Sequence, residues 1–134
     1  MTSPDEALAT LPIFSELSRS ELRKIRSLMT PVNIPAGRTF ITEGSAVVEA
    51  FILLEGEAVV TRGGKEIARL GPGAVVGEMA VLSGVPRTAS VTAETDILAE
   101  VLNRREFVSL LDQEPSVTKS ILIGVLRRLH DLQS

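Results

Sequence analysis

The segment that decides the fold is GEMAVLSGVPRTA, residues 77–89. It places Glu78 and Arg87 on either side of a short apolar run and a Gly-Val-Pro turn. Gly77 allows the backbone to approach a ligand closely, and residues 78–82 are good helix formers. A short helix that begins there would direct unpaired N–H groups at a bound anion. The segment therefore predicts an anion-binding loop.

The two charged side chains of this segment suit different parts of one small ligand. Arg87 carries a planar set of donors that matches phosphate oxygens in pairs. Glu78 is an acceptor and requires a hydroxyl donor, so a ribose 2′-OH beside a phosphate satisfies both residues. Thr88 adds a hydroxyl at the phosphate edge or toward a base. The alternative interpretation of the spacing is a structural ion pair between Glu78 and Arg87.

Residues 77–80 followed by 86–89 resemble the phosphate-binding cassette of cyclic nucleotide-binding domains, the modules of catabolite activator proteins, cyclic-nucleotide-dependent kinases and gated channels. Three more segments resemble the family pattern: IPAGRTFITEG at 34–44, FILLEGEA at 51–58 and LGPG at 70–73. The resemblance implies a mainly β fold with flanking helices. In detail, it implies an antiparallel β-barrel or jelly roll (a double-stranded β-helix) with an N-terminal helical segment, a short cassette helix and two C-terminal helices.

The resemblance also implies a role for each site residue. The cyclic phosphate is assigned to Arg87 and to the backbone N–H groups of Gly77, Glu78, Met79 and Ala80. The ribose 2′-OH is assigned to Glu78, and the phosphate edge or the base to Thr88. The base would rest on aliphatic barrel residues, for which the candidates are Val47 and Val76.

A lid over the base is expected from the final helix. The chain has no Trp or Tyr and its last Phe is Phe107, so an aromatic lid is not available from that helix. Closure would rely on Leu126, Leu129 or the aliphatic part of Arg128. The expected ligand is cAMP in preference to cGMP, with no other cofactor.

Two positions depart from the family pattern. Val76 stands where the family often has an aromatic residue, so we expect thinner packing beneath the cassette. Residues 45–50, SAVVEA, lack the Gly-Asp elements that are common in this loop of the family, which weakens the expectation of ligand contacts from that side.

The order of elements along the chain agrees with this fold. Residues 4–10 and a capping-box pattern at Ser18–Glu21 predict N-terminal helices, the second continuing until Pro31. Short apolar runs divided by Gly and Pro then predict strands, with a two-residue hairpin at Gly63-Gly64. Helices are expected to open at Asn103 and at Pro115. We expect a single domain over 1–134, with helices at 1–31, the barrel at 32–103 including the cassette at 77–89, and helices at 104–134.

Composition excludes several other classes of protein. A net charge of -3 argues against a broad nucleic-acid surface on this segment. Zero cysteines exclude thiolate metal sites, and a single histidine, His130, excludes the histidine cluster of a metal-binding cupin. No nucleophile and base can be assembled near Glu78, so we expect neither a metal nor catalysis. With no membrane-length apolar run and no secretory signal, we expect a cytoplasmic protein without membrane contact.

The function expected is a cyclic nucleotide sensor that passes ligand binding to its C-terminal helices. One alternative is a degenerate domain that has lost its ligand and serves in dimerisation or docking. The other is the sensor half of a transcription regulator or enzyme whose effector domain is absent. The apolar stripe of the last helix, which includes Leu122 and Val125, is either core or the interface of a homodimer.

Overall fold

The computed structural model describes residues 3–45, 49–77 and 87–133 of the chain. The N-terminal part contains helix α1 (Pro4–Thr10), a 3₁₀ turn η1 (Pro12–Phe14) and helix α2 (Arg19–Arg26). The strands are β1 (Thr30–Ile34), β2 (Thr39–Ile41), β3 (Glu49–Glu55), β4 (Ala58–Arg62), β5 (Lys65–Leu70), β6 (Val75–Val76), β7 (Ser90–Ala93) and β8 (Ile97–Asn103). Helices α4 (Arg104–Gln113) and α5 (Pro115–Gln133) follow.

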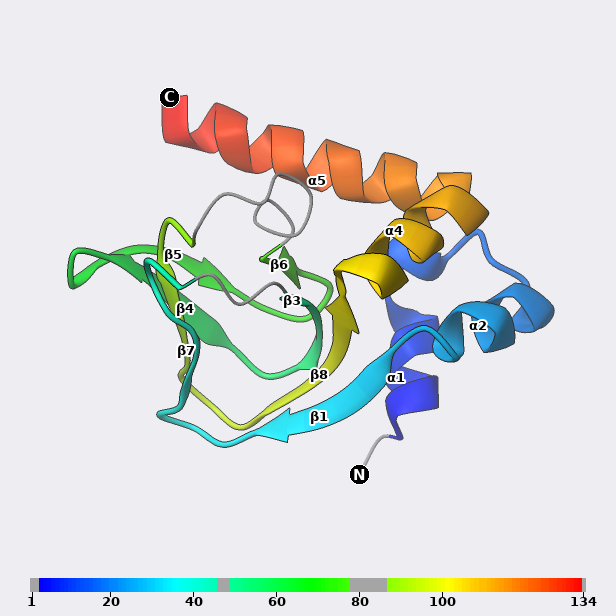
Figure 1. Ribbon diagram of the computed structural model, residues 1–134, viewed down its shortest axis with the longest axis horizontal. Helices are drawn as coiled ribbons and strands as arrows, with labels where there is room; N and C mark the ends of the chain where they lie inside the picture. The colour runs from blue at the N-terminus through cyan, green and yellow to red at the C-terminus, as the bar shows by residue number, and fades with distance from the viewer. Residues whose placement is uncertain (1–2, 46–48, 78–86, 134) are drawn as a thin grey trace.

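The strands form two antiparallel sheets that pack face to face. One has the order β1-β8-β3-β6 and the other β2-β7-β4-β5. Figure 1 shows α1, α2 and α4 grouped beside the strands, with α5 running across the top of the molecule. The predicted fold class, an antiparallel jelly roll with flanking helices, is confirmed, with two separate sheets in place of a closed barrel. The predicted cassette helix lies outside the described residues.

Both faces of the first sheet are buried, because side chains alternate along its central strands. On β3, Ala50, Ile52 and Leu54 face a core shared with the helices, while Phe51 and Leu53 face the core between the sheets. The helical core also contains Phe14, Ile25, Phe107 and Leu110. This arrangement fixes β3 between the helices on one side and the space between the sheets on the other.

Local sequence signals explain several element boundaries. Ser18 and Glu21 form the predicted capping box at the start of α2, and Asn103 and Glu106 form a second one at the start of α4. The predicted hairpin is also confirmed, since β4 pairs with β5 across Gly63-Gly64 and both glycines have positive φ. Pro115 begins α5 as predicted.

The predicted end of the second helix is wrong. The helix ends at Arg26 instead of continuing to Pro31, and Thr30–Ile34 is strand β1. The strand pairs antiparallel with β8 on one side only, so it lies at the edge of its sheet. An edge strand tolerates proline, because one row of its backbone N–H groups has no partner strand.

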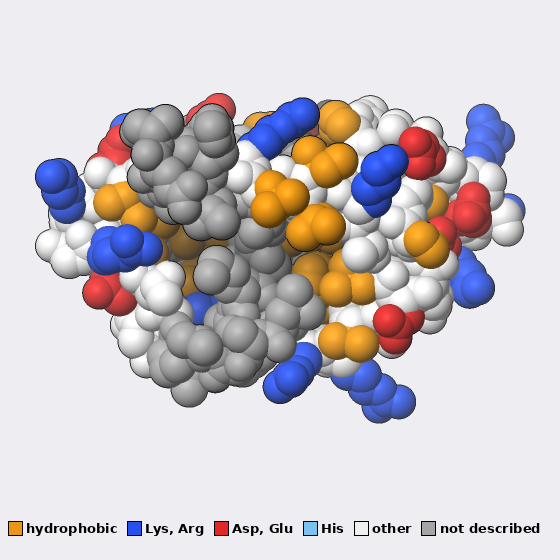
Figure 2. Space-filling view, turned by 90° about the horizontal axis from the view of Figure 1, so that it is seen from above, with side chains coloured by type: hydrophobic (Ala, Val, Ile, Leu, Met, Phe, Trp, Pro, Cys, Tyr) orange, Lys and Arg blue, Asp and Glu red, His pale blue; other side chains and the backbone are white. Residues whose placement is uncertain are grey.

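The C-terminal helix is buried at its start and exposed further along. Val117 and Ile121 belong to the helical core, whereas Leu122, Ile123 and Leu126 are 40–56% exposed. Figure 2 shows hydrophobic side chains gathered on this face beside Lys and Arg side chains. In the described part of the chain, no helix is both long enough and apolar enough to span a bilayer.

Candidate functional site

Arg87 is a buried cation held by backbone carbonyl groups. Its residue is 7% exposed. Its Nη1 donates to the carbonyl of Gly77 at 2.8 Å, and its Nη2 donates to the carbonyl of Glu49. These carbonyls belong to the residue after β6 and to the first residue of β3. The side chain therefore connects its own segment to the residue after β6 and to the start of β3, which lies 38 residues away in the sequence.

Gly77 is required at this position for two physical reasons. Its φ of +83° lies in the left-handed region, which other residues adopt only with strain. A Cβ atom on Gly77 would lie 2.5 Å from Nη1 of Arg87 and 2.8 Å from the carbonyl oxygen of Glu49. The absence of a side chain at Gly77 is thus what lets the Arg87 guanidinium reach both carbonyls.

The backbone around Arg87 is also paired. The N–H of Arg87 donates to the carbonyl of Ser45 at 3.1 Å, and the N–H of Gly44 donates to the carbonyl of Arg87 at 2.8 Å. One residue further on, the carbonyl of Thr88 accepts a hydrogen bond from Nε of Arg62 at 3.0 Å. These bonds tie Arg87 to the loop after β2 and to the β4–β5 hairpin, so its position is set by the sandwich.

A cavity of about 130 Å³ lies beside Arg87. Its walls come from β2, from the loop that follows β2, from the start of β3 and from Arg87 itself: Phe40, Ile41, Thr42, Ser45, Glu49, Phe51 and Arg87. The rings of Phe40 and Phe51 meet edge to face, with centroids 5.1 Å apart and an interplanar angle of 69°. The cavity thus combines an aromatic wall with a fixed guanidinium.

The positive charge of Arg87 is only partly compensated. Burial lowers the pKa of Arg87, and the negative charge of Glu49 opposes that shift. An arginine nevertheless stays protonated at neutral pH. Among the described residues, no carboxylate forms an ion pair with Arg87. The carbonyl groups orient the guanidinium without cancelling its charge, which leaves the charge available to an anion in the cavity.

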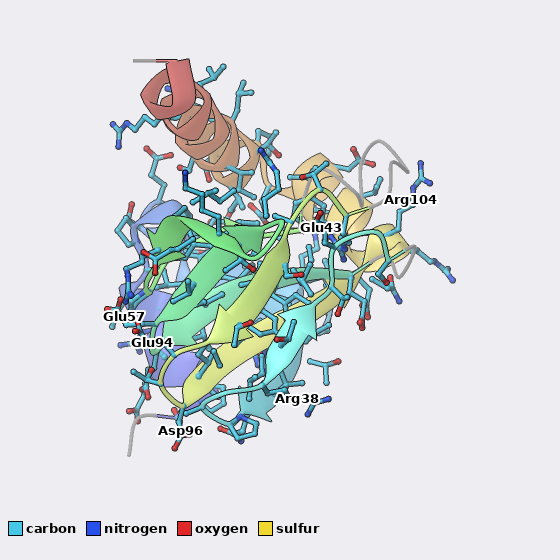
Figure 3. All side chains as sticks on the ribbon, turned by 90° about the vertical axis from the view of Figure 1, so that its left-hand side faces the viewer. Arg38, Glu43, Glu57, Glu94, Asp96 and Arg104 are labelled. Carbon is cyan, nitrogen blue, oxygen red and sulfur yellow. The ribbon has the colours of Figure 1, made fainter. Side chains whose placement is uncertain are left out.

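The acidic residues of two other turns lie away from this end of the strands. Glu57 follows β3, and Glu94 and Asp96 lie between β7 and β8. Figure 3 shows these three side chains well separated from Glu43, which belongs to the loop after β2. Glu43 itself accepts a hydrogen bond from the N–H of Gly63 at 3.0 Å. In the described chain, no group of three or more His, Cys, Asp or Glu side chains is arranged to hold a metal ion.

The structure brings together some of the residues that the sequence predicted and leaves others apart. Gly77 and Arg87 are in contact. Thr88 is exposed, and Val76 is buried in the core between the sheets, where it pairs with Phe51. Leu126 is 54% exposed on α5. Val47, Glu78, Met79 and Ala80 lie outside the described residues, as do the side chains of Arg128 and Leu129.

Sequence reasoning missed most of the cavity wall. Phe40, Phe51, Thr42 and Ser45 were not predicted as site residues, and neither was Glu49. A signal existed for the aromatic pair, because Phe40 and Phe51 lie in the two short apolar runs that flank the loop after β2. Their position relative to Arg87 depends on the pairing of strands that are distant in sequence.

Comparison with known proteins identifies the family to which the chain belongs. The family model described as "Cyclic nucleotide-binding domain" matches residues 31–114. This match covers more than half of the chain, and it includes the cavity wall, Gly77 and Arg87. The chain therefore belongs to the cyclic nucleotide-binding domain family, and the resemblance identified from the sequence is confirmed.

Individual relatives agree with the family assignment. The chain is 28% identical over 131 residues to a CRP-like cAMP-activated global transcriptional regulator of Mycobacterium tuberculosis, covering 94% of this chain and 58% of the relative. It is 39% identical over 110 residues to a cAMP-dependent protein kinase regulatory subunit of Yarrowia lipolytica, covering 80% of this chain and 29% of the relative. The chain thus spans 58% or less of the length of these two relatives.

A solved structure supports the same conclusion. The structure of PKAR CBD2 with Sp-2Cl-cAMPS bound matches with a TM-score of 0.79 at 25% sequence identity. The match covers 97% of this chain and 89% of that chain. The two proteins share the fold over nearly their full lengths.

Proposed function

We propose that this domain is a sensor that binds cAMP in preference to cGMP and relays binding through its C-terminal helices. The observation that carries the proposal is the buried guanidinium of Arg87, held by two carbonyls on the wall of an aromatic-lined cavity. A cyclic phosphate supplies a negatively charged group in direct contact with Arg87, which no carboxylate among the described residues provides. The preference for cAMP rests on the relatives above, which are named for cAMP.

The proposed roles of the site residues follow the family pattern. Arg87 and the N–H groups of Gly77, Glu78, Met79 and Ala80 hold the cyclic phosphate. Glu78 accepts a hydrogen bond from the ribose 2′-OH, and Thr88 lies at the phosphate edge or the base. Val47 and Val76 are the residues proposed to lie against the base. Leu126, Arg128 and Leu129 are the proposed lid.

A short chain of contacts supports the proposed relay. Arg87 donates to the carbonyl of Glu49, and Glu49 is the register partner of Asn103 between β3 and β8. Asn103 is also the N-cap of α4, because its side chain accepts from the N–H of Glu106 at 2.8 Å. A ligand that shifts Arg87 would act on the start of α4 through two residues. A relay requires two conformations of the domain that differ in the position of α4, and the ligand must bind these conformations with different affinity.

Residues 1–134 form, in this proposal, one domain with no catalysis of its own and no binding of nucleic acid or membrane through this segment. A cytoplasmic location is proposed, because a cysteine-free chain suits a reducing compartment. The exposed Leu122, Ile123 and Leu126 of α5 favour a homodimer through this helix.

Two alternative functions differ from this one in their context or in their ligand. The length of the relatives favours the sensor half of a larger regulator, since the chain covers 58% of one and 29% of the other. A sensor half of a larger regulator would bind the same cyclic nucleotide. A degenerate domain used only for docking or dimerisation would bind no nucleotide, so a nucleotide-binding measurement distinguishes it from the proposed sensor.

The test is calorimetric titration of the protein with cAMP and cGMP. We expect stoichiometric binding that Arg87→Ala weakens by about thirty-fold to several thousand-fold, equivalent to roughly 2–5 kcal/mol, because a buried phosphate loses its charged partner. The exposed Arg38 serves as the matched control, and Arg38→Ala should leave affinity unchanged. Circular dichroism checks that each variant is folded.

A second arm of the titration tests Glu78. Glu78→Ala should cost less affinity than Arg87→Ala, and the variant should bind 2′-deoxy-cAMP about as well as cAMP. Equal binding by the wild type and Arg87→Ala, or no binding at all, would support the docking function instead.

A further inference from the structure

The cavity beside Arg87 carries a second charged group. Glu49 is the one acidic residue among the seven that line the cavity in the described structure. Phe40, Ile41, Thr42, Ser45 and Phe51 are neutral, and Arg87 is the cation. The lining residues therefore include one cation and one acid.

Glu49 contacts Arg87 through its backbone and not through its carboxylate. Nη2 of Arg87 donates to the carbonyl of Glu49. The carboxylate forms no ion pair with the guanidinium among the described residues, and the Glu49 side chain is only half-buried. Its negative charge nevertheless raises the pKa of Arg87 against the effect of burial. The two charges are close enough to interact, yet neither neutralises the other by direct contact.

We infer that Glu49 is a charge-selectivity residue, which makes the cavity favour a singly charged phosphodiester over a doubly charged phosphomonoester. This inference rests on the proposed function and adds a residue that the family resemblance did not assign. The relevant ligand pair is a cyclic nucleotide and its hydrolysis product, the 5′-monophosphate. The two differ by the ring ester and by up to one negative charge.

Simple electrostatics gives the direction of the effect. A phosphodiester carries one negative charge, whereas a phosphomonoester carries between about −1.5 and −2 at neutral pH. Attraction to Arg87 and repulsion from Glu49 both grow with the charge of the ligand. With both residues present, attraction to Arg87 and repulsion from Glu49 largely cancel for the additional charge of the monoester. The monoester also loses more hydration free energy than the diester when it enters the site. Without the carboxylate, Arg87 would attract the monoester more strongly than the diester.

The experiment compares three adenine nucleotides on the wild type and on Glu49→Gln. cAMP, 5′-AMP and the methyl ester of 5′-AMP each displace a fluorescent cyclic nucleotide from the protein at pH 7.5. The methyl ester has an open phosphate with a single charge, so it separates the effect of charge from that of the ring. Glu55→Gln is the matched control, because Glu55 is the acid at the other end of the same strand.

We expect Glu49→Gln to improve the affinity for 5′-AMP by about fivefold to tenfold more than the affinity for cAMP. The methyl ester should follow cAMP, and Glu55→Gln should behave as the wild type. A measurement on the wild type requires no variant: lowering the pH from 7.5 to 5.5 should strengthen 5′-AMP binding relative to cAMP, because a phosphomonoester gains a proton near a pKa of about 6.

Three results would overturn the inference. An unchanged ratio of 5′-AMP to cAMP affinity in a folded Glu49→Gln protein would show that the carboxylate does not act on the ligand. An equal gain for the methyl ester would show that shape, not charge, is what the substitution changes. If the wild type binds cAMP but its relative affinity for 5′-AMP does not rise at low pH, charge selectivity is also wrong. Failure of the wild type to bind cAMP would instead overturn the proposed function, and this inference with it.

Discussion

Arg26 and Arg87 both bring a positive charge toward the interior of the protein, but they meet different partners. Nη1 of Arg26 contacts both carboxylate oxygens of Glu100, whose side chain is fully buried on β8. Arg87 donates to the carbonyls of Gly77 and Glu49, with no carboxylate paired to it in the described chain. Arg26 is paired with a carboxylate, whereas Arg87 is hydrogen-bonded to uncharged carbonyl groups.

This difference separates a structural ion pair from the proposed anion-binding group. The Arg26–Glu100 pair connects the last turn of α2 to the helix-facing side of the first sheet. Its opposite charges compensate one another, so it offers little to a ligand. The carbonyls around Arg87 satisfy hydrogen bonds and fix the orientation of the guanidinium, while its net charge persists. A buried arginine beside a cavity is therefore informative about function only when its partners are known.

The largest effect on stability is expected from breaking the Arg26–Glu100 ion pair. Arg26→Met should lower the free energy of unfolding by about 3–5 kcal/mol, because it leaves the Glu100 carboxylate buried without this partner. Urea denaturation measures the loss. The control is Arg23→Met on the exposed face of the same helix, which should change stability by less than about 0.5 kcal/mol.

A double variant sharpens this prediction. Arg26→Met combined with Glu100→Gln should recover much of the lost stability, since neither charge of the pair remains. Nucleotide affinity should stay within about twofold of wild type in all these variants, because the pair lies outside the cavity. A stable Arg26→Met protein, or one that loses nucleotide affinity while folded, would contradict the distinction between the two arginines.

An intermediate effect is expected at Gly77. Gly77→Ala should destabilise the protein by about 1–2 kcal/mol through its left-handed backbone conformation alone. The new Cβ also meets Nη1 of Arg87 and the carbonyl of Glu49, so the guanidinium must move. Gly37 provides the control, because its φ is +90° but an added Cβ would have no neighbour within 4 Å.

The two glycine variants should therefore differ in nucleotide binding. Gly37→Ala should cost stability alone, whereas Gly77→Ala should also weaken cAMP binding by about tenfold, because the donors of Arg87 lose their orientation. Thermal unfolding and calorimetry measure the two quantities. Equal loss of affinity in both variants would mean that the position of Arg87 does not depend on the space at Gly77.

The smallest effect concerns pH and the junction between α4 and α5. Glu114 is 5% exposed at the C-cap of α4, and burial raises the pKa of its carboxyl. The negative charge of Glu21 raises this pKa further, while Lys24 opposes the shift. The folded state thus binds the proton of Glu114 more tightly than the unfolded state does. The contribution of this group to stability is present at low pH and is lost as the pH rises from the ordinary glutamate value through the raised one.

Glu114→Gln should remove this dependence. The variant should gain thermal stability relative to the wild type as the pH rises from 4 to 7, by a few degrees at most. Asp112→Asn, an exposed change on the same helix, is the control and should show no such trend. If the stability difference between Glu114→Gln and the wild type is constant over this pH range, Glu114 does not titrate in the way described.

The sequence predicted those features that depend on local chemistry. The capping box at Ser18 and Glu21, the hairpin at Gly63-Gly64 and the start of α5 at Pro115 each follow from residues close together in the chain. The cassette pattern placed Gly77 and Arg87 at one site, and the structure brings these two residues into contact. These interactions form over short sequence separations, so the local pattern carries most of the information.

Features that depend on distant pairing could not be predicted in the same way. The helical periodicity of Leu22, Ile25 and Leu28 continues beyond Arg26, but pairing with β8 makes Thr30–Ile34 a strand. Tertiary contacts override local propensity at this point. Glu49 and Arg87 are 38 residues apart in the sequence and meet through the folding of the chain. The sequence around Glu49 therefore did not indicate that this residue lines the cavity.

The most direct test of the central claim is a crystal structure of the protein grown with saturating cAMP. The account predicts electron density for the nucleotide beside Phe40 and Phe51, with its cyclic phosphate about 2.7–3.1 Å from the guanidinium nitrogens of Arg87. It would be contradicted by an empty cavity in which Arg87 keeps only its carbonyl partners, or by a nucleotide whose phosphate is bound elsewhere on the protein.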